Sequence, residues 1–328
     1  MTALLEVDDL VVDFPLPGGR ARVLHHVDLR IGAGEAVGLV GESGCGKSMT
    51  ALAVMGLMPP AAETSGSIRL AGEDLLGRSD AAMSRVRGRR IGMIFQEPMT
   101  ALNPVRTIGD QVAEGMRLHF GLGRREALDR AVSLLERVGL PPDRFPPGLY
   151  PHQLSGGQRQ RVVIAIALAC GPELLIADEP TTALDVTIQA QILDLITEVA
   201  AETGSALMMI SHDLGVIAET TDRMLVMYAG TVVEEGPTAE VFAHMAHPYT
   251  RGLFAAMPSR ALVGAGRGRL ATIPGQVPDP RRPRVGCPFA PRCPRAREQC
   301  RTEIPPADPF GPDHRVRCFY PGPEASGG

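Results

Sequence analysis

A glycine-rich stretch followed by lysine and serine is the part of this sequence whose residue types most directly suggest chemistry. It runs Gly41-Glu-Ser-Gly-Cys-Gly-Lys47-Ser48 and fits the pattern G-x-x-x-x-G-K-[ST], in which backbone N–H groups face phosphate oxygens and the lysine reaches the outer phosphates. The Ser48 hydroxyl suits Mg²⁺, and a helix beginning at Lys47 would direct its N-terminal dipole at the same anion. The pattern predicts a nucleoside triphosphate site, with a chance glycine-rich turn as the alternative. The predicted contacts are Gly41, Ser43, Gly44, Cys45, Gly46, Lys47, Ser48 and Met49.

Two carboxylates, Asp178 and Glu179, follow an apolar segment further along the chain. Residues Leu174–Ala177 are expected to form a buried strand, which would fix both acids at its end. One carboxylate could hold a metal ion there while the other polarises an attacking water as general base. Taken alone, the pair is equally consistent with a core strand that ends in two surface acids.

Other polar residues of interest also lie next to predicted strands or turns. Gln96 follows the apolar run Ile91–Phe95, and His212 follows the run Leu207–Ser211. In Leu154-Ser-Gly-Gly-Gln158 the glycines let the backbone approach a phosphate closely, and a helix is expected from about Gln160. Each of these features alone would be compatible with an ordinary solvated strand end or turn.

In this order and spacing, the motifs between Gly41 and His212 resemble the ATP-binding cassette (ABC) family. The resemblance implies a pair of subunits, in which the Ser-Gly-Gly turn of one caps ATP held by the phosphate loop of the other. It implies catalysis by Glu179, His212 and Gln96, with Mg²⁺ held through Ser48, Gln96 and Asp178. It implies that Phe14 lies against adenine, for which a core phenylalanine is the alternative. The residues implied to reach the partner's ATP are Ser155, Gly156, Gly157, Gln158 and Asp185.

The flanking residues narrow the resemblance to the dipeptide and oligopeptide import branch. They are Phe95–Pro104, Tyr150–Ser155, His247–Leu253 and Gly286–Cys293. The branch implies an ATPase on the cytoplasmic face of the membrane, working with a second and different ABC subunit and two transmembrane permeases, and indirectly with an extracytoplasmic solute-binding protein. Import of nickel, opines or other small solutes remains an alternative, as does, more remotely, a soluble non-transport ABC ATPase.

Composition supports a globular protein of more than one lobe. The chain has 328 residues, 44% hydrophobic and 21% charged, and its formal charge is −4. The charge provides no global basic field for nucleic acid, and none is expected as a partner. The longest strictly apolar run, Val162–Cys170, is shorter than the roughly 20 residues that a membrane-spanning helix needs. The N-terminus lacks the features of a secretory signal, so a cytosolic protein is expected, in which Cys170 is a core residue.

The order of the patterns predicts an α/β fold with an ABC-type P-loop core, a helical insert and a loop-rich, cysteine-containing C-terminal extension. Within the insert, Leu128, Val132, Leu135 and Val138 recur at helical spacing, and Gly139 is a plausible stop. Strands are also expected at 36–40 and 224–227. The predicted boundaries are 1–96 and 159–243 for the core, 97–158 for the insert with the signature turn, and 244–328 for the extension.

Four cysteines, Cys287, Cys293, Cys300 and Cys318, lie in the Pro- and Arg-rich extension. Disulfides are disfavoured in a reducing cytosol, so the thiolates could hold a metal centre that organises this segment. The spacing matches neither a C-x-x-C zinc site nor a ferredoxin run, which leaves iron–sulfur, zinc and free thiols open. The import branch is associated with a [4Fe–4S] cluster on such cysteines, which favours iron–sulfur. His314 could replace a ligand, although a solvated loop histidine is expected.

Overall fold

The computed structural model describes residues 3–182, 184–257 and 272–322, which form two compact units. Unit one comprises residues 1–5, 31–36 and 69–210, and unit two comprises residues 6–30, 37–68 and 211–328. Both units combine strands with helices, which confirms the predicted α/β class.

Unit one contains a parallel sheet in the order β6 (Ile91–Ile94), β7 (Leu174–Asp178) and β8 (Ala206–Ser211). All residues of the three strands are buried. Strands buried on both faces of a sheet have continuous apolar runs rather than alternating ones, which is the pattern seen in the sequence. The predicted strands at these three places are confirmed to within one residue at each end.

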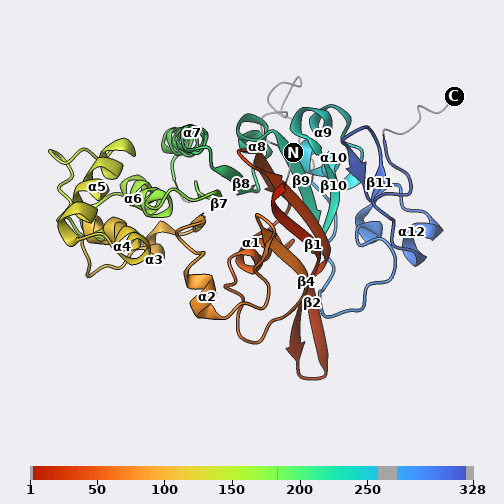
Figure 1. Ribbon diagram of the computed structural model, residues 1–328. Coiled ribbons are helices and arrows are strands. Elements are labelled where there is room, and N and C mark those ends of the chain that lie inside the picture. The colour runs from red at the N-terminus through yellow and green to blue at the C-terminus, as the bar shows by residue number, and fades with distance from the viewer. Residues whose placement is uncertain (1–2, 183, 258–271, 323–328) are drawn as a thin grey trace, which may run out of the picture. The chain divides into compact units, whose positions relative to one another are not determined.

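Helices make up most of the rest of unit one (Figure 1). The predicted periodic segment forms α5 (Arg124–Arg137), with Leu135 and Val138 buried, and Gly139 follows it at a φ of +83°. A left-handed glycine just beyond the last turn is a common way to end a helix. The other helical segments are α2 (Asp80–Ser84), α3 (Pro98–Ala101), α4 (Ile108–Phe120), η1 (Pro151–Gln153), α6 (Gly156–Leu168) and α7 (Val186–Thr203).

Unit two contains a mixed sheet that is extended by the C-terminal part of the chain. Strand β3 (Ala36–Val40) pairs in parallel with β9 (Arg223–Tyr228), and β9 pairs antiparallel with β10 (Thr231–Pro237). The short strands β12 (Arg315–Val316) and β11 (Asp308–Pro309) follow β10 in antiparallel order. A second sheet has β1 (Ala3–Leu16) between β2 (Gly19–Gly32) and β4 (Glu63–Leu70). The last two residues of β4, Arg69 and Leu70, belong to unit one and pair there with β5 (Glu73–Asp74).

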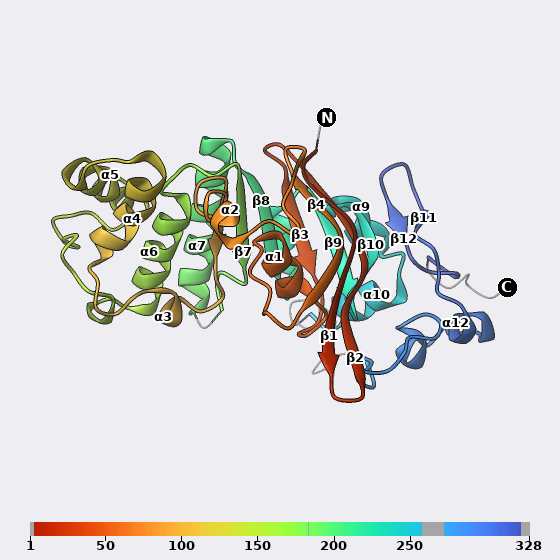
Figure 2. The ribbon, with the colours of Figure 1, turned by 60° about the horizontal axis from the view of Figure 1, so that its bottom comes forward.

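The described parts of the C-terminal extension, residues 244–257 and 272–322, contain more regular structure than their composition suggests. Figure 2 shows its short elements near β10 and α10. Among the residues that the structure describes, unit two has the helices α1 (Lys47–Val54), α8 (Leu214–Thr220), α9 (Thr238–His244), α10 (Pro248–Ala255), η2 (Ala290–Arg292) and α12 (Glu298–Thr302). Across the described parts of the chain, no helix is both long and apolar enough to cross a membrane.

Candidate functional site

The phosphate-type loop connects buried strand β3 to helix α1 in unit two. Gly41, Gly44 and Gly46 have positive φ angles of 152°, 77° and 109°. A Cβ at Gly41 would lie 2.2 Å from the carbonyl oxygen of Met227, so a side chain there would displace the loop. Because α1 is preceded by a glycine in the left-handed region, no capping side chain covers its first amides. The local geometry therefore suits an anion at this helix end.

Lys47 is buried and its ammonium lies against its own loop. Its Nζ donates to the carbonyl oxygens of Gly41 at 2.8 Å and Glu42 at 3.2 Å. Cys45, in the same loop, is 1% exposed. Burial raises the pKa of the Cys45 thiol, so this side chain packs as a small buried group within the loop.

The acidic pair lies at the end of β7 in unit one. Asp178 is 5% exposed, and the Glu179 amide donates to the carbonyl oxygen of Ile210 at 2.9 Å. Glu179 has a φ of +47°, a conformation that costs a non-glycine residue about 1–3 kcal/mol and concentrates at functional sites. Its Oε2 accepts hydrogen bonds from Gln96 Nε2 at 3.2 Å and Thr182 Oγ1 at 3.1 Å. Unit one thus brings together the predicted Gln96 and Glu179 side chains and adds Thr182.

The Ser-Gly-Gly turn forms the N-terminus of α6. Ser155 Oγ accepts from the Gln158 amide at 3.4 Å, and Gln158 Oε1 accepts from the Ser155 amide at 2.8 Å. Because this reciprocal capping box fixes the first turn, the helix begins at Gly156 and the expected start near Gln160 was wrong. A Cβ on Gly157 would lie 2.8 Å from Ile188 Cγ2 of α7. Ser155 and Gly156 are exposed, so the turn is open to a ligand.

Asp185 lies at the N-cap of α7, where its Oδ1 accepts from the Ile188 amide at 3.0 Å. This bond explains locally why an aspartate precedes the helix. Its predicted contact with a partner subunit stays a prediction. His212 is the residue after β8; it belongs to unit two and is exposed. Its catalytic role is likewise still a prediction.

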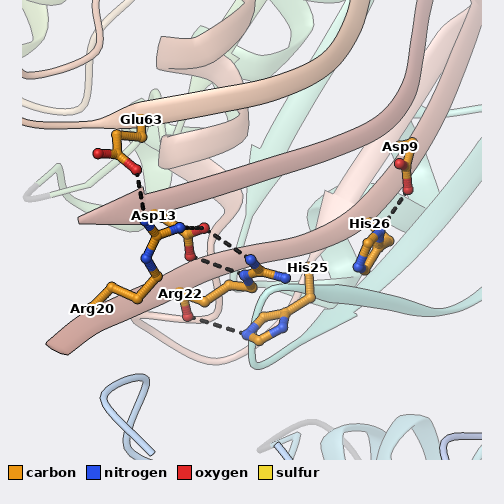
Figure 3. Close-up of polar contacts among 7 residues, drawn as sticks. All are labelled: Asp9, Asp13, Arg20, Arg22, His25, His26 and Glu63. Carbon is orange, nitrogen blue, oxygen red and sulfur yellow. Dashed lines mark hydrogen bonds and ion pairs between the residues drawn. The ribbon is translucent and has the colours of Figure 1, made fainter. Parts of the chain in front are cut away.

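Phe14 is half-buried on β1. The residue before it, Asp13, belongs to a network of charged groups (Figure 3). Asp13 is 4% exposed and accepts two hydrogen bonds of 2.9 Å from Arg22 and one of 3.2 Å from Arg20. The Arg22 guanidinium holds the pKa of the Asp13 carboxyl below its usual range. The network fixes the strand that carries Phe14, whereas the contact of Phe14 with adenine stays a prediction.

The extension lines the space next to the phosphate loop, which the sequence did not indicate. A cavity of about 730 Å³ is bounded by Gly44 of the loop, Arg22 and His25 of β2, and residues from 276 to 301 of the extension. Burial, together with the positive charge of Arg284, lowers the pKa of His25 to about 4, so the imidazole is neutral at pH 7. A second unforeseen contact joins Arg292 of the extension to Glu42 of the loop.

The four cysteines of the extension all line one small cavity, together with apolar side chains such as Phe289 and Phe319. Burial raises the pKa of Cys318 to about 11 and also raises the pKa values of Cys287 and Cys293. Within the ranges that the structure describes, however, no three His, Cys, Asp or Glu side chains form a group able to hold a metal ion. The cysteine cavity alone therefore does not identify a cofactor.

Two expectations about single residues were wrong. His314, expected in solvent, is 3% exposed, and its Nε2 lies 2.8 Å from Glu234 Oε1 because the β11–β12 segment folds back onto β10. Cys170 is only half-buried, because it follows the last turn of α6 and lines a surface hollow with Arg89 and Phe120.

Comparison with known proteins identifies both parts of the chain. Residues 24–182 match the family "ABC transporter", and residues 233–300 match "Oligopeptide/dipeptide transporter, C-terminal region". A Brucella melitensis protein, provisionally named as a peptide import ATP-binding protein, is 50% identical over 96% of both chains. The oligopeptide transport ATP-binding protein OppD of Salmonella typhimurium is 46% identical over 97% of this chain and 94% of its own.

A solved structure supports the same assignment. The dimeric post-hydrolysis structure of the ATP-binding cassette MJ0796, bound to ADP and phosphate, has a TM-score of 0.64 and 28% identity. It covers 71% of this chain and 98% of its own. The predicted family and fold are therefore confirmed. This chain belongs to the ATP-binding proteins of ABC transporters, in the group with the oligopeptide/dipeptide C-terminal region, and it is an ATPase.

Proposed function

We propose that the chain is the ATP-hydrolysing subunit of an importer of dipeptides and oligopeptides, bound peripherally at the cytoplasmic face of the membrane. The observation that carries this proposal is the similarity of the extension, because residues 233–300 match the oligopeptide/dipeptide C-terminal region. Relatives named for peptide import are similar over nearly the whole chain. The partners in this proposal are a second and different ABC subunit, two transmembrane permeases and, indirectly, an extracytoplasmic solute-binding protein.

In the proposed mechanism, the phosphate loop binds ATP and Lys47 exchanges its loop carbonyl partners for the outer phosphates. Glu179 acts as general base on the attacking water. The hydrogen bonds from Gln96 and Thr182 to Glu179 Oε2 support this role, because they orient the carboxylate. His212 contacts the γ-phosphate, and Phe14 lies against adenine.

The oxygen donors of Ser48, Asp178 and Gln96 suit Mg²⁺, which prefers hard oxygen ligands. These residues would hold the ion. When bound, it would neutralise charge that develops on the phosphates.

The exposed Ser155 turn supports a paired mechanism, in which it caps ATP on a partner subunit. Its amides stand at a helix N-terminus, where an anion is stabilised. Asp185 would contact the same site from the start of α7.

Replacing the carboxylate tests the general base. The Glu179→Gln variant is expected to bind ATP normally and to hydrolyse it at least about 100-fold more slowly, a typical loss for a general base. Asp194→Asn is a matched control because Asp194 is an exposed acid of α7. Hydrolysis by Glu179→Gln within threefold of the unaltered protein would remove Glu179 from this role.

The transported solute is tested on the assembled complex. The chain should co-purify with two polytopic membrane proteins, and its ATPase activity should rise when peptide-loaded binding protein is added to the reconstituted complex. Stimulation by nickel or an opine instead would reassign the solute and leave the ATPase role intact. Purification without membrane partners would favour a soluble ABC ATPase.

For the cysteine cavity we propose a [4Fe–4S] cluster, with zinc as the alternative. The shared cavity of Cys287, Cys293, Cys300 and Cys318 supports this, because four thiolates are the usual ligands of such clusters. The side chains would have to turn toward one another, since they do not form a ligand group as they stand. Protein purified without oxygen should be brown and contain about four irons per chain, whereas a colourless preparation with one zinc would overturn the cluster.

A further inference from the structure

Arg292 is a buried residue of the extension whose guanidinium reaches the phosphate loop. Its Nη1 donates to Glu42 Oε2 at 2.7 Å and its Nη2 donates to Glu42 Oε1 at 3.0 Å. The Arg292 side chain is 4% exposed and that of Glu42 is 27% exposed. Two parallel charge-assisted hydrogen bonds in such surroundings hold their partners in one relative orientation.

The remaining donors of Arg292 fix the guanidinium itself. Nε donates to the carbonyl oxygen of Pro274 at 2.8 Å, and Nη2 also donates to that of Ile273 at 3.2 Å. The group lies 5.7 Å from the centre of the Tyr228 ring at the end of β9. Arg292 is therefore anchored on three sides, so the loop is held by a rigid support rather than by a mobile surface side chain.

Glu42 is placed in the loop so that its position controls the groups that meet phosphate. Its amide donates to Tyr249 Oη at 2.8 Å, and its carbonyl oxygen accepts from Lys47 Nζ and from the Cys45 amide. A shift of Glu42 would thus move the lysine and the loop backbone together. The side chain of Glu42 is held by Arg292, which lies 250 residues away in sequence.

We propose that Arg292 is a positioning residue for ATP, by which the C-terminal extension holds the phosphate loop in its binding conformation and neutralises Glu42. The proposal rests on ATP binding by this loop. The charge of Arg292 offsets that of Glu42, and this matters because an unpaired carboxylate beside the loop would repel the triphosphate.

The same geometry links the cysteine cavity to the loop. Arg292 is the last residue of η2 and directly precedes Cys293, and the Ala290 amide donates to the carbonyl oxygen of Cys287 at 3.0 Å. Arg292 therefore lies in the short backbone segment between two of these cysteines, Cys287 and Cys293.

The test measures MgATP affinity of the full-length chain by isothermal titration, with thermal unfolding without nucleotide as a check that each variant is folded. Arg292→Ala should raise the Kd about tenfold, equivalent to about 1.4 kcal/mol. Arg292→Lys keeps the charge but not the two-point fork, and should raise it about threefold. Glu42→Gln should also raise it about threefold.

A double variant separates positioning from a general loss of stability. Once Glu42 is neutral, Arg292 has no charge to compensate, so Glu42→Gln with Arg292→Ala should bind like Glu42→Gln alone. Such non-additivity is expected only for residues that act on each other. In steady-state hydrolysis, Arg292→Ala should raise KM for ATP while kcat stays within about twofold.

Arg281→Ala is the control, because it removes an exposed ion pair with Asp279 from the same extension and should leave the Kd unchanged. A folded Arg292→Ala protein with a Kd within twofold of the unaltered chain would overturn the proposal. If that variant does not fold, normal Kd values for both Arg292→Lys and Glu42→Gln would overturn it equally. Failure of peptide import would not affect this result, whereas an unaltered chain without ATP affinity would refute the ATPase function itself.

Discussion

Glu234 is a buried carboxylate of β10 that hydrogen-bonds to residues of the extension. Its replacement tests how much these bonds contribute to the free energy of unfolding. Oε1 accepts from the Ala246 amide at 2.7 Å and lies 2.8 Å from His314 Nε2. Oε2 accepts from the His247 amide at 2.9 Å and Thr250 Oγ1 at 2.5 Å. The Glu234 side chain is 0% exposed, so water cannot replace these bonds.

Glu234→Gln keeps the shape but replaces one acceptor oxygen by an NH₂ donor. Whichever oxygen is replaced, a backbone amide, of Ala246 or of His247, loses its acceptor, while the hydroxyl or imidazole beside it can adjust. A buried unsatisfied donor costs about 1–3 kcal/mol, and the remaining bonds lose their charge assistance. The expected destabilisation is about 3 kcal/mol.

Equilibrium urea unfolding measures this value. The chain has no tryptophan, so tyrosine emission can be followed directly, and buried Tyr228 and Tyr249 report on unit two. Glu235→Gln is the matched control, because the neighbouring carboxylate is 25% exposed and makes only a 3.7 Å pair with Arg315. It should change stability by less than about 0.5 kcal/mol. A Glu234→Gln protein as stable as this control would refute the reasoning.

Two other predictions follow from single contacts. Cys45 is 1% exposed and burial raises the pKa of its thiol. A maleimide should therefore label Cys45 in the native protein at least about tenfold more slowly than in urea, as measured by mass spectrometry. Equal labelling rates would contradict this expectation and show that the loop opens readily. Gly157→Ala brings a methyl group to within 2.8 Å of Ile188 Cγ2 and should lower ATPase activity at least about tenfold in the assembled complex, while ATP binding by the isolated chain stays normal. Reduced ATP binding by the isolated chain would contradict the proposal that the turn containing Gly157 acts on the ATP of a partner subunit. Gly148→Ala is the control, because an added Cβ at Gly148 meets open space.

The features that could be predicted from the sequence are those whose physical cause is local. The loop from Gly41 to Ser48 needs glycines at left-handed φ angles, and that requirement leaves a fixed spacing in the chain. Fully buried parallel strands leave apolar runs, which located β6, β7 and β8. The start of α6 lies earlier than predicted because the reciprocal bonds between Ser155 and Gln158 fix the first helical turn, whereas two consecutive glycines by themselves favour a flexible turn.

The features decided by tertiary structure join residues that are distant in sequence. The pair of Arg292 with Glu42 spans 250 positions, and that of His314 with Glu234 spans 80. Neither pair leaves a periodic pattern or a motif, because only the folding of the extension onto β9 and β10 brings its members together and removes water from them. Sequence patterns therefore identified an ATPase and its phosphate loop, whereas the support of that loop by the extension became visible only in three dimensions.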